Sequence, residues 1–116
     1  MTESAITAVQ ATPNVVHIAV TRRALSDSAA SGLLAEVSAA ADAQPKLPVI
    51  LDLKKVEFIP SAVLGALVRL SQRLKLEGRR LILVHVDRRV RGTLSVTRLE
   101  KVLEVRETLD DAVAEF

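Results

Sequence analysis

Short apolar runs alternate with longer amphipathic stretches along most of the chain. The apolar runs are rich in aliphatic and β-branched residues, and they predict strands at residues 15–20 (VVHIAV), 47–53 (LPVILDL) and 79–86 (RRLILVHV). The last two runs are nearly unbroken, which is typical of strands buried on both faces. A turn signal at residues 12–14 separates the first run from the alternating segment 4–10, and this arrangement predicts a β-hairpin. A further short strand is expected near residues 102–105.

The intervening stretches have helical spacing. Residues 26–44 repeat apolar side chains three or four positions apart, and Ser26 or Asp27 is expected to cap that helix. A second amphipathic helix is expected to begin near Ser61 and to end before Gly78, which is suited to the position after a helix C-terminus. Shorter helices are expected over residues 88–95 and 109–114.

The predicted order is therefore ββαβαβαβα in one domain over residues 1–116. Strands that alternate with helices indicate an α/β fold with a mixed, mostly parallel sheet, because parallel neighbours need crossover connections. The N-terminal hairpin adds an antiparallel edge to this sheet, and about four helices cover it.

Composition narrows the class of protein. Hydrophobic residues make up 49% of the 116 residues but aromatic residues only 2%, so the core must be aliphatic. The absence of cysteine excludes disulfides and thiolate metal sites. We find no apolar stretch of the roughly 18 residues that a membrane span requires, and no signal-peptide pattern at the first ten residues. A cytoplasmic location and no membrane association are expected.

The formal net charge of +2 is spread unevenly. Residues 1–58 carry a net −1, residues 59–106 a net +7, and residues 107–116 a net −4. The basic middle raises the question of nucleic-acid binding. Single-strand binders also use stacking aromatics, and the chain has only Phe58 and Phe116. We therefore expect most of the arginines to lie on solvated faces (Arg69, Arg73, Arg79, Arg80, Arg88, Arg89 and Arg91).

Enzyme motifs are missing from the sequence. The four glycines are isolated, so no glycine-rich phosphate loop is present, and no nucleophile elbow surrounds Ser61. His17 and His85 each fall in an apolar run and are expected to be ordinary packed or edge histidines. Asp52 is the one carboxylate inside a strongly apolar run, which is reminiscent of the phosphorylated aspartate of receivers, but the acidic partners for Mg²⁺ are lacking. We expect Asp52 to satisfy nearby backbone donors, and we expect no cofactor, no metal and no enzymatic activity.

Ser61 stands where an apolar run gives way to the second long helix, directly after Pro60. The proline fixes the direction of the chain there. The serine hydroxyl can then cap the N–H groups of Val63 and Leu64, a contribution of roughly 1 kcal/mol. The same helix end can accommodate a phosphate on the serine. The sequence therefore allows two roles for Ser61, a helix cap and a phosphorylation switch.

The order of several short motifs resembles that of the STAS domain family, the fold of bacterial anti-sigma factor antagonists. They are the Asp-Leu that ends residues 47–53, then Val-x-Phe-Ile, then Ser61-x-x-Leu-Gly65-x-Leu, the helix ending at Gly78, and LSVTRLEKV. The resemblance runs from Val15 to the C-terminus. It implies a STAS-like domain that binds an anti-sigma factor of the serine-kinase type, which phosphorylates a serine at the start of this helix.

By position, the resemblance assigns the phosphorylation candidate to Ser61. Pro60 stands where the family usually has aspartate, and Val63 where it often has glycine. The implied partner-binding surface comprises Ser26, Asp27, Pro60, Ser61, Ala62 and Gly65. Thr97 and Ser95 are weaker hydroxyl candidates.

Two alternatives to the phosphorylated switch stay open. The first is a STAS scaffold or oligomerisation module in a signalling complex that is not phosphorylated, and homo-oligomers are allowed in either case. The second is nucleic-acid binding, which is not expected.

Overall fold

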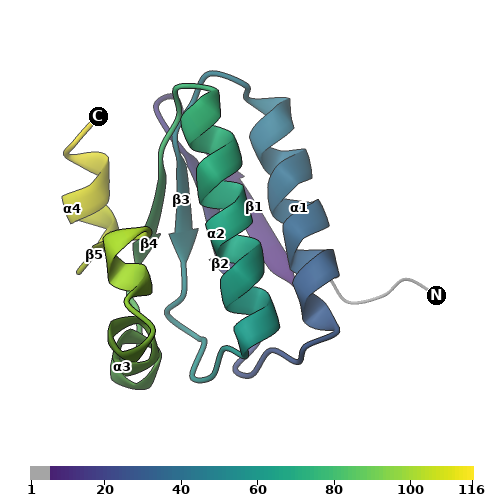
Figure 1. Cartoon of the computed structure of the whole chain (residues 1–116). Coiled ribbons are helices and arrows are strands. Elements are labelled where there is room, and N and C mark those ends of the chain that lie inside the picture. Colours follow the sequence, from purple (N-terminus) through teal and green to yellow (C-terminus); the bar gives the residue numbers. More distant parts are fainter. Residues whose placement is uncertain (1–5) are drawn as a thin grey trace.

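The computed structural model describes residues 6–116, and its element order is the one that the sequence predicts (Figure 1). Five strands form one sheet in the order β1-β2-β3-β4-β5, with bounds β1 Thr7–Ala11, β2 Val16–Val20, β3 Val49–Asp52, β4 Leu81–Val84 and β5 Glu104–Arg106. Strands β1 and β2 are antiparallel and the other neighbours are parallel. The predicted hairpin and mixed sheet are confirmed, although Ser4 and Ala5 of the predicted first strand lie outside the described residues.

Helices cover the two faces of the sheet unequally. Their bounds are α1 Ala29–Ala43, α2 Ser61–Leu76, α3 Arg88–Val96 and α4 Leu109–Val113, and a 3₁₀ turn, η1 (Leu99–Lys101), precedes β5. Helices α1 and α2 lie side by side against one face (Figure 1). The short α4 packs against the other face, over β3, β4 and β5. The outer part of that second face, on β1 and β2, carries Ala8, Gln10, His17 and Ala19, all of them exposed or partly exposed.

The strands supply two cores because successive residues of a strand point to opposite faces. Val49 and Leu51 of β3 face the larger core under α1 and α2, together with Val37 of α1 and Leu67 of α2. Ile50 faces the smaller core under α4. All four residues of β3 are buried, as the unbroken apolar run predicts.

Gly78 ends α2 as predicted. Its φ of +74° lies in the left-handed region that glycine adopts without a steric penalty. The N–H of Gly78 donates to Lys75 O at 3.0 Å, and the N–H of Arg79 donates to Leu74 O at 2.8 Å. This pair of bonds is the Schellman motif, and it satisfies two of the last carbonyls of the helix. The chain then turns directly into β4.

Arg79 is buried, with 5% of its surface exposed, so its predicted place on a solvated face is wrong. The guanidinium donates to three main-chain carbonyls: Nε to Leu47 O at 2.8 Å, and Nη2 to Ala41 O at 3.0 Å and to Gln44 O at 2.8 Å. Nη1 also donates to Glu77 Oε1 at 3.1 Å. Arg79 therefore closes the C-terminal end of α1, where the helix leaves carbonyl oxygens without intrahelical partners.

Candidate functional site

The edge of the sheet where the parallel strands end carries the predicted site. The loop after β2 and the loop before α2 lie next to each other there, and α1 and α2 both begin at this end (Figure 1). A parallel bridge joins Ala24 and Phe58, and the Glu57 N–H donates to Arg23 O at 2.7 Å. Strand order alone would gather these loops at one edge, and the bridge fixes them to one another.

Ser61 is the first residue of α2 and its side chain does not cap the helix, so the predicted cap is wrong. The N-cap is Pro60, with φ −77° and ψ 164°, and its carbonyl accepts the N–H groups of Val63 at 3.0 Å and Leu64 at 3.1 Å. Those are the two donors that the serine was expected to bond. Ser61 is exposed, and within residues 6–116 its hydroxyl has no hydrogen-bond partner.

Helix α1 also lacks the predicted cap. Ser26 and Asp27 precede it in a turn, and their carbonyls accept the N–H groups of Ala29 at 3.0 Å and Ala30 at 3.2 Å. The N-cap residue is Ser28, which makes no side-chain capping bond, and its hydroxyl lies 2.9 Å from that of Ser26. Ser26 and Asp27 are both exposed. They directly follow the Ala24–Phe58 bridge, so the structure brings them to the same edge as Ser61.

The other predicted site residues lie on or beside the first turns of α2. Ala62 is exposed, and Pro60 and Gly65 are partly exposed. Phe58, which the sequence reasoning did not include in the surface, is 58% exposed and stands two residues before Pro60. Because it lies next to the predicted surface residues, we add Phe58 to this surface. We call Ser26, Asp27, Phe58, Pro60, Ser61, Ala62 and Gly65 the docking edge.

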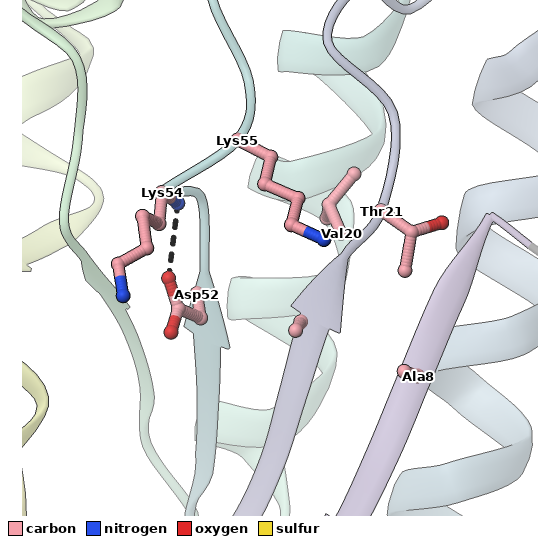
Figure 2. Close-up of a pocket in the computed structure, with 7 residues that line it drawn as sticks. Ala8, Val20, Thr21, Asp52, Lys54 and Lys55 are labelled. Carbon is pink, nitrogen blue, oxygen red and sulfur yellow. Dashed lines mark hydrogen bonds between the residues drawn. The ribbon is translucent and has the colours of Figure 1, made fainter.

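A polar cluster that the sequence did not predict lies beside the docking edge, on the face of the sheet opposite α1 and α2. His17 Nε2 is 3.2 Å from Asp52 Oδ2, and His85 Nδ1 is 3.2 Å from Asp52 Oδ1. The Lys54 N–H also donates to Asp52 Oδ1, at 2.9 Å (Figure 2). The expectation that Asp52 satisfies a nearby backbone donor is therefore met. His17 and His85 both contact the Asp52 carboxylate, whereas the sequence analysis expected two ordinary packed or edge histidines.

Asp52 is held as a carboxylate by these bonds. Burial acts to raise the pKa of Asp52, but the hydrogen bonds from the Lys54 N–H, His85 and His17 outweigh it and keep the pKa below its ordinary value. The sequence predicted His85 inside a strand, but it lies just after the end of β4. Its φ is +54°. Such a conformation is uncommon for a side chain with a Cβ, and here it accompanies the contact with Asp52.

Ion pairs neutralise part of the positive charge of residues 59–106. Arg73 pairs with Asp42 and Glu77, Arg80 with Glu104 and Glu115, and Arg106 with Glu104 and Glu115. Through Glu115 the acidic C-terminal segment neutralises part of the basic middle. In the described part of the chain, no group of three or more histidine and carboxylate side chains is placed to hold a metal ion. No helix in that part is long and apolar enough to cross a membrane.

The fold and this edge define a small mixed α/β domain with an exposed serine at the start of its central helix. Solved structures with this architecture include an anti-sigma factor antagonist (STAS) domain protein from Planctomyces limnophilus, with a TM-score of 0.85, 23% identity, and coverage of 97% of this chain and 98% of that chain. An anti-sigma factor antagonist from Mycobacterium paratuberculosis gives 0.80 at 27% identity, covering 94% of this chain and 91% of that chain. The anti-sigma factor antagonist SpoIIAA in its unphosphorylated form gives 0.76 at 19% identity, covering 94% of each. A structure of Bacillus SpoIIAA in the phosphorylated form also matches.

The family model described as STAS domain matches residues 7–112. The chain therefore belongs to the STAS domain family. The resemblance seen in the sequence motifs is thereby confirmed for nearly the whole chain.

Proposed function

We propose that this chain is a non-enzymatic regulatory module of the anti-sigma factor antagonist type, which binds an anti-sigma serine kinase through the docking edge. Phosphorylation of Ser61 by that kinase then ends the complex. The proposal makes the chain a cytoplasmic transcription regulator that acts by partner switching.

The observation that carries the proposal is the state of the Ser61 hydroxyl. It is exposed, it makes no hydrogen bond within the described residues, and the helix start that it occupies is already capped by the Pro60 carbonyl. A kinase can therefore modify it without breaking a structural contact. A phosphate would add about −1.5 to −2 charges beside Phe58 and Ala62. A partner that packs against these apolar side chains would have to remove water from the phosphate, which would weaken binding.

The test is intact-mass measurement after incubation with the purified serine-kinase-like ATPases encoded in the same genome. We expect one phosphate on the parent chain and none on Ser61→Ala. A matched control is Ser95→Ala, because Ser95 is also an exposed helical serine, and this control should be modified like the parent. In a pull-down with the same kinase, Ser61→Glu should weaken the complex at least tenfold. Modification that persists in Ser61→Ala would overturn the assignment.

A second candidate is a scaffold or oligomerisation module in a signalling complex that is not phosphorylated. Pro60 favours it, because the residue before the serine offers a kinase no carboxylate. In that case Ser61→Glu leaves every complex at the parent affinity. The same pull-down therefore separates the two candidates.

A further inference from the structure

A hollow lies on the face of the sheet opposite α1 and α2, next to the Asp52 cluster (Figure 2). Its volume is about 250 Å³. A hollow of this size has room for several waters or for one small organic molecule. Ala8 of β1 and Ala19 of β2 line it, and both are among the smallest side chains that a strand can carry. The space exists because no larger side chain fills it.

The charges around the hollow favour an anion. Lys54 and Lys55 line it, both are exposed, and neither makes an ion pair with another described residue. The Asp52 carboxylate is already bonded by the Lys54 N–H and the two histidines. Glu57, in the adjoining hollow that shares both lysines, lies 3.6 Å from Arg23 and 3.6 Å from Arg89. Asp52 also lines the hollow and keeps its negative charge, because hydrogen bonds do not cancel it. The two ammonium groups exceed the charge of Asp52 by one, so a net positive charge remains.

The positions of the lysines are complementary. Figure 2 shows the Lys55 side chain extending toward Val20 and Thr21, whereas Lys54 runs down the other side of Asp52. The Asp52 carboxylate therefore stands between the two lysines, and Lys54 offsets its charge. Lys55 is the cation on the side of Val20 and Thr21, where Ala8 and Ala19 supply apolar surface. A bare inorganic ion would leave that surface unused, whereas a molecule with an apolar body would cover it.

We propose that this hollow binds a small organic anion, with its apolar body against Ala8 and Ala19 and its carboxylate or phosphate group held by Lys55, while Lys54 offsets the charge of Asp52. The site is separate from the Ser61 hydroxyl, so the proposal stands whether or not the serine is phosphorylated. Lys54 and Lys55 belong to the loop that leads to Phe58 and Pro60, which places the bound anion beside the docking edge.

The experiment is an NMR titration of the ¹⁵N-labelled chain with glutarate and, separately, with phenyl phosphate, at an ionic strength held constant with sodium chloride. Glutarate tests a carboxylate and phenyl phosphate a phosphate, and each carries an apolar body. We expect a saturable shift of the Ala19, Lys54 and Lys55 amides with at least one probe, with a Kd of about 1 mM or lower. If neither probe saturates at these amides, the proposal fails.

Two variants distinguish a built site from general attraction to surface charge. Ala8→Leu, at an exposed position of the edge strand, occupies the floor without changing any charge, and it should weaken binding at least tenfold. Lys54→Met with Lys55→Met should do the same. The control is Lys46→Met with Lys101→Met, which removes equal charge from exposed positions outside the hollow and should change the Kd less than twofold. If Ala8→Leu binds as the parent does, the anion is only attracted to the surface and the site is refuted.

Discussion

Arg79→Met tests whether the buried guanidinium is a structural clamp. Methionine keeps an unbranched side chain of similar reach but removes every donor. Leu47 O then loses its only hydrogen bond within the described residues. Because Leu47 is only partly buried, the cost is about 1 kcal/mol, the low end of the range for an unsatisfied acceptor. Ala41 O and Gln44 O each keep one main-chain donor, from Gln44 and Leu47. Their loss is therefore smaller, about 0.5–1.5 kcal/mol each.

The bond to Glu77 adds little, because the side chain of Glu77 is 39% exposed. The sum predicts a loss of about 3 kcal/mol in the free energy of unfolding. With an unfolding entropy of about 2.1 cal/mol/K per residue, this corresponds to a fall in Tm of about 12 °C for a chain of 116 residues.

The assay is chemical and thermal unfolding followed by far-UV circular dichroism, because the chain has no tryptophan or tyrosine for fluorescence. The matched control is Arg69→Met, since Arg69 is exposed in α2 and makes no ion pair or hydrogen bond with any described residue. We expect it to stay within about 0.5 kcal/mol of the parent. A loss below about 1 kcal/mol for Arg79→Met, or one equal to that of Arg69→Met, would refute the bond-by-bond reasoning.

Three further predictions use the same unfolding assay. Ser61→Ala should change stability by less than about 0.5 kcal/mol, because the hydroxyl makes no hydrogen bond to any described residue, and a loss of about 1 kcal/mol would show that it caps the helix after all. Asp52→Asn should cost about 1–2 kcal/mol at pH 7. The folded-state pKa of Asp52 lies below its ordinary value of 3.8, so its stabilisation is present above that pH and is lost as the pH falls through the depressed pKa. The gap between variant and parent should therefore close in acid, and a gap independent of pH would contradict the role of the charge. Gly78→Ala should lose about 1 kcal/mol because of its positive φ, whereas Gly65→Ala, inside α2 with its nearest neighbour for a Cβ at 3.7 Å, should gain about 0.5 kcal/mol. Equal effects of the two glycine changes would refute the conformational argument.

Hydrophobic periodicity predicted the fold because the sheet and helices are stabilised mainly by the burial that the periodicity records. The unbroken run at β3 gave a strand buried on both faces, and Gly78 marked the end of α2. The sequence predicted the first residue of each helix less clearly. Ser61 could have been the N-cap or the first helical residue, and the sequence Pro-Ser fits both. The extended Pro60, whose carbonyl accepts the first helical bonds, decided between them.

The Asp52 cluster could not be predicted from local sequence, because it depends on strand register. Ala19 pairs with Asp52 across β2 and β3, which places His17 two residues away on the same face as the carboxylate. Val84 pairs with Asp52 across β3 and β4, so His85 is the next residue along. A slip of one residue in the pairing of β2 with β3 would turn His17 to the other face. His85 lies beyond the end of β4, so strand alternation does not place it, and it reaches Asp52 from a residue with positive φ. Arg79 was missed for a related reason, since its partners lie at the end of a helix more than thirty residues earlier.

These long-range contacts explain how the docking edge is held. The loop before α2 is fixed at one end by Asp52, which accepts the Lys54 N–H, and in its middle by the bridge between Phe58 and Ala24. Its other end is the extended Pro60 that begins the helix. The exposed side chains of Phe58 and Ser61 therefore project from a backbone that is set by the sheet, and neither takes part in setting it. Under the proposed function, a change of charge at Ser61 would act on what the edge binds while leaving in place the contacts that hold the fold.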